Sequence, residues 1–82
     1  MFHVGDRVKT RPVSSYTDHA NSVYSNREAV VTAIHFPFGL HIQYKVKFVE
    51  PFFDFGCEVK THYYYDFDDA LEHIDSRSCL EV

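Results

Sequence analysis

The fold of this chain is decided by residues 27–50, whose sequence is REAVVTAIHFPFGLHIQYKVKFVE. In residues 42–48 apolar side chains occupy every second position, which is the period of a β-strand with one face in a core and the other in water. Residues 28–36 are mostly small or β-branched, and Pro37 and Gly39 then supply a fixed φ and a residue that accepts positive φ. The stretch predicts two antiparallel strands joined by a short loop.

The register of this hairpin is predicted from symmetric pairing about Phe38. The expected pairs on the core face are Ile34 with Ile42, Thr32 with Tyr44 and Val30 with Val46. The pairs on the other face include His35 with His41 and Val31 with Lys45. A slip of one residue would exchange the two faces, so the sorting of apolar side chains onto one face supports this register.

The composition predicts one domain over residues 1–82. A chain of 82 residues with 45% hydrophobic residues is near the lower limit for burying a core unaided. It has 6 Tyr and 8 Phe and no Trp, and each of these rings can remove roughly 150–250 Å² from water. An aromatic core of this kind suits a small barrel.

The N-terminal residues do not have the pattern of a signal peptide, and no apolar run approaches the roughly 18 residues needed to span a bilayer. We therefore expect a cytoplasmic protein without a membrane partner. In that compartment Cys57 and Cys79 are expected to be reduced thiols and not a disulfide.

The net charge of −4 is concentrated near the C-terminus, because residues 66–82 contain six carboxylates and one arginine. Proteins that bind the phosphate backbone usually gather Lys and Arg on one face, so an acidic end makes a nucleic-acid partner less expected. It favours a protein partner with a basic surface.

The segment from residue 11 to residue 26 is rich in Ser, Thr, Asn and Asp and has no sustained period, so it is predicted to be a long loop. Long loops in small domains often bind partners, which makes Tyr16 and Tyr24 candidates. Large rings are costly to leave in water, so the preferred interpretation is that both rings cover the open end of the barrel. Residues 57–65 are predicted to be a strand that turns Tyr63 inward and Tyr64 to solvent.

Residues 66–74 are predicted to form a short amphipathic helix. Its apolar stripe consists of Phe67, Ala70, Leu71 and Ile74, at the spacing i, i+3, i+4 and i+7. Asp66 is a good N-cap, and further acidic residues in the first turn complement the helix dipole. Residues 79–82 then have the length and pattern of a last short strand.

Several of these segments resemble the small SH3-like barrels of the KOW and Tudor type. The similar segments are VGDRV at 4–8, REAVVTAI at 27–34, IQYKVKFVE at 42–50 and LEV at 80–82. The resemblance implies a mainly β fold with five strands in a strongly bent sheet, a long first loop and a short 3₁₀ or helical turn before the last strand. It does not imply one function, because such barrels bind proteins, peptides, RNA and DNA.

No constellation in the sequence predicts a metal, a cofactor or a catalytic residue. His35 opposite His41 would give two imidazoles without a third ligand, which is a poor zinc site. Cys57 and His62 fall on opposite faces of an alternating strand, which argues against a nucleophile and base pair. The acidic group that begins at Asp66 lacks the Gly and Glu of an EF-hand loop.

The sequence therefore predicts a non-catalytic protein-interaction module, or a small regulatory or inhibitory protein, that binds a macromolecular partner. The candidate partner-binding residues are Tyr16, Tyr24, Tyr64, Asp66, Asp68, Asp69 and Glu72. One alternative is an acidic mimic of nucleic acid, and another is a nucleic-acid-binding barrel, suggested by Lys45 and Lys47 beside Tyr64. An exposed edge strand also makes a homodimer possible.

Overall fold

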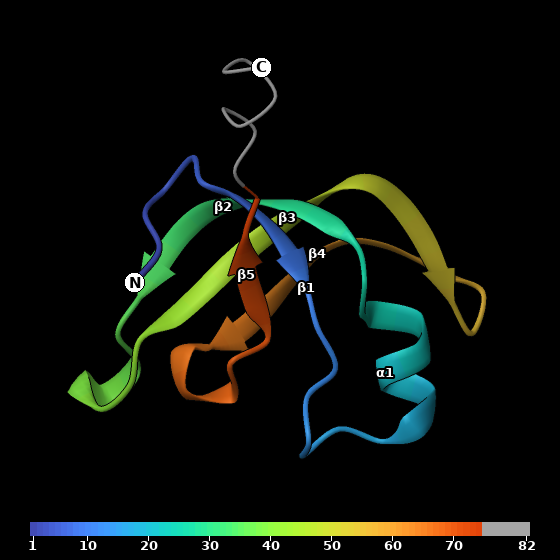
Figure 1. Ribbon diagram of the computed structural model, residues 1–82, viewed down its shortest axis with the longest axis horizontal. Helices are drawn as coiled ribbons and strands as arrows, with labels where there is room; N and C mark the ends of the chain where they lie inside the picture. The colour runs from blue at the N-terminus through green and yellow to red at the C-terminus, as the bar shows by residue number, and fades with distance from the viewer. Residues whose placement is uncertain (75–82) are drawn as a thin grey trace.

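The computed structural model describes residues 1–74, and Figure 1 shows their arrangement. The elements in chain order are β1 (Arg7–Thr10), α1 (Asp18–Tyr24), β2 (Glu28–His35), the 3₁₀ turn η1 (Pro37–Gly39), β3 (Gln43–Asp54), β4 (Cys57–Tyr65), the 3₁₀ turn η2 (Asp66–Asp68) and β5 (Leu71–His73). The strand predicted at 79–82 and the thiol of Cys79 lie outside the described residues.

The five strands form one antiparallel sheet in the order β4-β3-β2-β1-β5. The sheet is bent, so that β1 and β5 pass in front of β3 and β4 in Figure 1. Within residues 1–74 no pairing joins β4 to β5, so the sheet does not close into a barrel. The prediction of a mainly β fold with five strands is confirmed.

The hairpin predicted for residues 27–50 is confirmed, and its alternation holds in β3. Tyr44, Val46 and Phe48 are 1%, 0% and 2% exposed, whereas Lys47 between two of them is exposed. The two lysines of this strand therefore lie on the outer face, and the apolar residues build the core.

The predicted register of the hairpin is wrong. Beside the loop Ile34 pairs with Tyr44, two residues from its predicted partner. Beyond a register shift between Val31 and Ala33, Val31 pairs with Val46. Thr32 is the extra residue of a β-bulge, and such a residue reverses the alternation beyond it. Val31 is therefore buried in the place predicted for Val30.

The two histidines that were predicted to face each other are also separated, because the register beside the loop is offset by two residues from the predicted one. His35 pairs with Gln43, and His41 lies beyond the end of the ladder. The paired-imidazole arrangement is therefore not formed.

The segment predicted to be loop contains the helix α1. Thr17 is its N-cap, and its Oγ1 accepts a hydrogen bond from the Ala20 N–H at 3.1 Å. The side chain of Asn21 forms two hydrogen bonds with the backbone of Val13, one accepted at 2.9 Å and one donated at 3.0 Å. Caps and tertiary hydrogen bonds stabilise this helix without a periodic apolar stripe, so periodicity could not reveal it.

Thr10 closes the base of the 11–26 segment and is 2% exposed. Its Oγ1 donates to the Tyr24 carbonyl at 2.7 Å and accepts from the Arg27 N–H at 2.9 Å. Its backbone N–H donates a hydrogen bond to the Arg27 carbonyl, and its carbonyl accepts one from the Asn26 N–H. Thr10 therefore joins the two ends of the segment where it connects to the sheet.

The predicted helix over residues 66–74 is wrong, and η2 and β5 occupy this stretch. Asp69 ends η2 in the left-handed region with φ of 52°, and β5 then pairs with β1. A two-turn helix would leave the backbone groups on this side of β1 without partners, and isolated short helices are marginal. The 3₁₀ turn η2 thus directly precedes β5, the last strand of the described residues.

The strand predicted at 57–65 is confirmed as β4. In its C-terminal half, however, the residues that face the core are those that were predicted to face solvent. Tyr64 pairs with Tyr44 and is 2% exposed, whereas Tyr63 is 46% exposed. The register shifts between Lys47 and Phe52, so Val59 and Tyr64 both lie on the core side although their spacing is odd. The prediction that Tyr64 is exposed is therefore wrong.

The core lies inside the bent sheet. Its buried apolar residues are Val8, Val13, Ala29, Val31, Tyr44, Val46, Phe48, Phe52, Tyr64, Ala70 and Leu71. Tyr16, Val23 and Tyr24 of the 11–26 segment pack against this cluster. The segment thus covers an open side of the sheet, which is the structural role considered for its two tyrosines.

We expect the Val46→Asp variant to be unfolded and the Lys45→Glu variant to be folded. An unpaired carboxylate at a fully buried position costs several kcal/mol, which is comparable to the whole stability of a small domain, about 5 kcal/mol. Thermal unfolding followed by circular dichroism tests both variants. Equal destabilisation would mean that the faces of β3 are wrongly assigned.

We expect Asp69→Asn to preserve stability to within about 1 kcal/mol, because Asn tolerates the left-handed conformation and an exposed ion pair contributes little. The Asp69→Ala variant removes the same charge but meets the steric cost of that conformation, about 1–2 kcal/mol. Urea unfolding of the pair separates the two effects. Equal loss in both variants would assign the cost to the ion pair.

Candidate functional site

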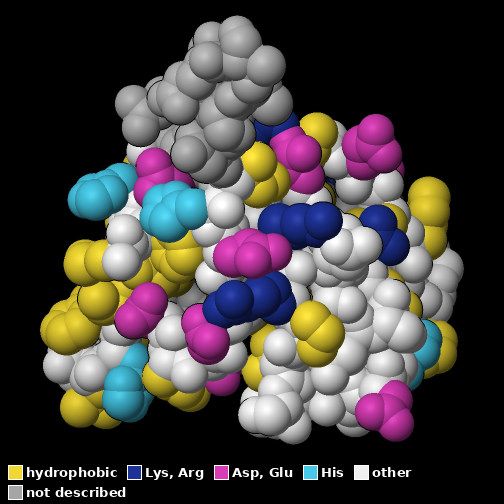
Figure 2. All heavy atoms as spheres, viewed as in Figure 1, with side chains coloured by type: hydrophobic (Ala, Val, Ile, Leu, Met, Phe, Trp, Pro, Cys, Tyr) yellow, Lys and Arg dark blue, Asp and Glu magenta, His cyan; other side chains and the backbone are white. Residues whose placement is uncertain are grey.

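Exposed apolar and aromatic side chains gather around the β2–β3 loop and η2. Phe38 at the tip of the loop is 96% exposed, and Leu40 and Phe67 are 69% and 62% exposed. Hydrophobic and histidine side chains are concentrated in the corresponding lower left part of Figure 2. We call these residues the aromatic surface, which consists of His35, Phe36, Phe38, Leu40, His41, Tyr63, Tyr65 and Phe67.

Ring contacts order much of this surface. Tyr65 and Phe67 stack with centroids 5.0 Å apart and an interplanar angle of 15°. His41 meets Phe67 edge-on at 4.9 Å, and His35 lies 6.1 Å from Tyr63. Offset stacking and edge contacts are the favourable aromatic geometries, so the rings support one another while their outer sides stay open.

Basic side chains border the aromatic surface on β3. Lys45 pairs with Tyr63 across the strands, and its Nζ lies 5.8 Å from the ring centroid. Lys47 occupies the next outward position, opposite Thr61. The tyrosine beside these lysines is therefore Tyr63, and not Tyr64 as the sequence suggested.

Two loops of the sheet present the same dipeptide in the same conformation. Phe38 has φ of 55° and precedes Gly39, and Phe55 has φ of 49° and precedes Gly56. Phe55 is 86% exposed. The left-handed region is unfavourable for Phe, and exposure gives its ring no compensating burial. The ring of Phe55 contacts His19, whereas no ring contact within the described residues accounts for Phe38.

A hollow between α1 and β4 brings together two of the predicted site residues. Its lining consists of Ser15, Tyr16, Thr17, Ala20, Tyr24 and His62. The rings of Tyr24 and His62 lie 4.8 Å apart. Burial raises the pKa of both tyrosines and lowers the pKa of His62, so a neutral imidazole is favoured here.

Asp54, at the end of β3, connects this helix to the β3–β4 loop. His19 Nε2 lies 3.0 Å from Asp54 Oδ1, and the Tyr24 hydroxyl donates to Oδ2 at 3.0 Å. The bond to His19, with that of Tyr24, lowers the pKa of the Asp54 carboxyl. The His19 ring also contacts Phe55 at 4.5 Å. This cluster holds the helix against the hairpin.

The four acidic candidates do not form a free array. Asp69 accepts from Arg11 Nη2 at 2.5 Å, and Glu72 lies 4.0 Å from Nη1 of the same arginine. Acidic and basic side chains alternate across the middle of the face in Figure 2. Asp66 and Asp68 flank the exposed Phe67. Burial raises the pKa of Tyr16, and the charge of Asp68 adds to this effect.

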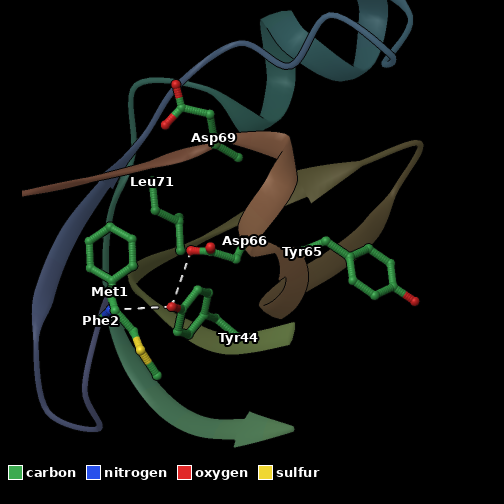
Figure 3. Close-up of a pocket in the computed structure, with 8 residues that line it drawn as sticks. Met1, Phe2, Tyr44, Tyr65, Asp66, Asp69 and Leu71 are labelled. Atoms are coloured by element: carbon green, nitrogen blue, oxygen red, sulfur yellow. Dashed lines mark hydrogen bonds between the residues drawn. The ribbon is translucent and has the colours of Figure 1, made fainter. Parts of the chain in front are cut away.

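A second hollow, shown in Figure 3, joins the N-terminus to η2. The Phe2 N–H donates to the Tyr44 hydroxyl at 3.2 Å, and that hydroxyl donates to Asp66 Oδ1 at 3.2 Å. Figure 3 shows the Tyr65 ring pointing away from this group. The hydroxyl of Tyr44 already has both a donor and an acceptor, so the arrangement explains attachment of the N-terminus better than ligand binding.

Within the described residues 1–74 no three His, Cys, Asp or Glu side chains come together as metal ligands. In the same part of the chain no helix is long and apolar enough to cross a bilayer.

The sequence did not identify Phe38, Tyr63 or Phe67 as candidates. Strict alternation placed Tyr63 on the core face of its strand, because the register shift between β3 and β4 could not be foreseen. Phe67 was placed on the apolar side of the predicted helix. A signal for Phe38 did exist, because an aromatic residue between Pro37 and Gly39 in a tight loop has little to pack against.

We expect the stability of the protein to decrease as the pH falls below 6.5. Burial lowers the pKa of His62 from its ordinary value of 6.5, so the unfolded chain binds the proton at a higher pH than the folded chain does. The destabilisation due to His62 is absent above pH 6.5 and grows as the pH falls toward the pKa of His62 in the folded state. In His62→Gln it should disappear.

Urea unfolding of both proteins between about pH 7 and pH 5 measures this effect. The same pH dependence in His62→Gln would assign the destabilisation to other groups.

The sequence matches no protein-family model, and no curated protein and no solved structure is significantly similar to it.

Proposed function

We propose that this chain is a non-catalytic protein-interaction module that binds its partner through the aromatic surface. The observation that carries the proposal is Phe38, which is 96% exposed in a left-handed conformation. A partner pocket that buries this ring would gain about 1.5–3 kcal/mol, whereas the isolated chain gains nothing from it. Clusters of exposed apolar side chains on small proteins commonly mark interaction sites.

We further propose that the fold is an SH3-like barrel that is open between β4 and β5. Three features support this proposal: the strand order, the long connection between β1 and β2, and the 3₁₀ turn before β5. These features agree with what the resemblance of the sequence implies. The fold class leaves the function open, so the function rests on the surface.

The chemistry of the surface indicates the kind of partner. Phe38 and Leu40 suit an apolar pocket, and Asp66 and Asp68 on either side of Phe67 suit basic side chains at its border. The partner is therefore a protein with an apolar pocket bordered by Lys or Arg. This agrees with the basic partner surface expected from the acidic C-terminal segment.

A second candidate function is binding of single-stranded nucleic acid. The observation that favours it is Lys45 beside the exposed ring of Tyr63, next to the stacked pair Tyr65 and Phe67. Open aromatic faces with nearby lysines are the elements of a base-stacking platform. The mimic of nucleic acid receives less support, because Asp69 and Glu72 are engaged by Arg11.

The test uses Phe38→Asn with Phe55→Asn as a matched control. Asn tolerates the left-handed conformation, so Phe38→Asn should melt at or above the temperature of the parent. Phe55→Asn also loses the ring contact with His19 and should remain folded. The immobilised chain is incubated with nuclease-treated lysate from its source cells, and bound proteins are quantified by mass spectrometry. We expect Phe38→Asn to lose a specific partner by about tenfold or more, and Phe55→Asn to retain it.

Three results would contradict the proposal or replace it. Equal capture by the parent and Phe38→Asn would remove the aromatic surface from the interaction. Capture that occurs only in lysate not treated with nuclease, falls steeply with salt and is lost in Lys45→Gln would favour the second candidate. Loss of capture in the Asp68→Asn and Asp69→Asn double variant, with Phe38→Asn unaffected, would favour the mimic.

A further inference from the structure

We propose that the free edge of β4, together with the hollow between β4 and α1, binds an extended peptide by adding it to the sheet as a sixth strand. This second surface goes beyond the proposed function, because it does not require Phe38. Its elements are the backbone of β4, the apolar lining of the hollow and one carboxylate nearby.

β4 is the long free edge of the sheet. It stands last in the order β4-β3-β2-β1-β5 and contains nine residues, whereas β5 at the other edge contains three. Among the described residues, the backbone of 57–65 forms no hydrogen bond outside its ladder with β3. In an antiparallel pair alternate residues direct both N–H and C=O away from the partner strand. This edge therefore offers donors and acceptors at regular intervals.

The edge is open to solvent along much of its length. Glu58, Lys60, Thr61 and Tyr63 are all exposed. No proline interrupts the strand, and Lys60 is its one lysine. Sheets usually protect long edges with proline, charge or a covering segment, because such edges pair readily with other chains. β4 has little of this protection.

The hollow lies beside this edge on the core side. Ala20 and Tyr24 of α1 form one wall, and His62 of β4 forms the other. The hollow is open to solvent. Its volume of about 410 Å³ is enough for a Leu or Phe side chain. Apolar atoms predominate in its lining, and the lowered pKa of His62 agrees with a neutral ring at this position.

A strand edge next to an apolar hollow specifies an extended peptide. Backbone hydrogen bonds along the edge hold the main chain, and alternate side chains of a strand point to one side, so one of them can enter the hollow. The Asp54 carboxylate lies 3.0 Å from the hydroxyl of Tyr24, which lines the hollow, and favours a Lys or Arg in the bound peptide. The predicted ligand is an extended segment with a Leu or Phe and a basic residue close to it.

The buried hydroxyl of Tyr64 gives a further reason to expect a ligand on this side. It has no hydrogen-bond partner in the described structure, and its ring contacts His62 edge-on at 4.8 Å. Buried hydroxyls without an acceptor are uncommon in native proteins. Burial, with the neighbouring Tyr16 and Tyr24, raises the pKa of this hydroxyl, so it lies close to the two tyrosines that line the hollow.

The test begins with selection of peptides from a random 12-residue display library on the immobilised full chain. The most enriched peptide is synthesised with a fluorophore, and its Kd is measured by anisotropy. Two further peptides carry N-methyl groups on odd or on even backbone amides. Strand addition uses one set of amides only, so one methylated peptide should lose about tenfold or more in affinity and the other should bind like the parent peptide.

Protein variants locate the site. Ala20→Gln fills the hollow and should weaken binding by about tenfold, because the apolar anchor loses its pocket. Ser22→Gln adds the same side chain to an exposed position of the helix outside the hollow and should leave binding unchanged. Amide hydrogen exchange gives an independent readout, since alternate amides of β4 should become protected when the peptide binds.

Each contrary result has a distinct meaning. Absence of an enriched peptide, or equal tolerance of both methylated sets, overturns strand addition. Loss of the peptide in Phe38→Asn places it on the aromatic surface and overturns this proposal without affecting the proposed function. Protection of β4 amides that rises with protein concentration, accompanied by a dimer in sedimentation, identifies a second copy as the occupant and also overturns the peptide proposal.

Discussion

The β-bulge at Thr32 determines which side chains of β2 enter the core, and much of the molecule follows from it. The extra residue places Val31 and Ile34 on the same side of the strand, opposite Val46 and Tyr44. A bulge also increases local twist and bends the strand that carries it. The bend lets the sheet fold over its own aromatic core, which a flat sheet could not enclose. The outward direction of Tyr63 depends instead on the second register shift, between Lys47 and Phe52 in the ladder of β3 and β4.

The sequence predicted the features that depend on an uninterrupted period. Tyr44, Val46 and Phe48 alternate without a break, so their burial could be foreseen. The faces on which Val30 and Tyr64 lie could not be foreseen. Each residue follows or adjoins a register shift, and no residue type in the sequence indicates these shifts. The stripe at Phe67 and Ala70 fits a helix locally, but pairing with β1 satisfies more backbone groups. Tertiary context prevailed over local pattern in these cases.

The candidate site was predicted less well than the fold, for a related reason. Tyr16 and Tyr24 were identified in the right segment, and they line a hollow instead of projecting freely. The acidic candidates were identified from charge alone, which cannot show that Arg11 engages Asp69. Exposure of Phe38 depends on the direction of a loop. Sequence periodicity describes regular elements, and the surfaces that matter here lie at their ends and edges.

The length of β3 has a consequence for how the molecule can be used. This strand of twelve residues separates the loops that carry Phe38 and Phe55, which project from opposite sides of the molecule in Figure 1. At about 3.3 Å per residue the strand spans at most about 40 Å, which is comparable to the longest dimension of the chain, 40 Å. The two Phe-Gly loops therefore belong to different ends of one strand. A partner that covers the Phe38 loop alone leaves the Phe55 loop open to a separate contact.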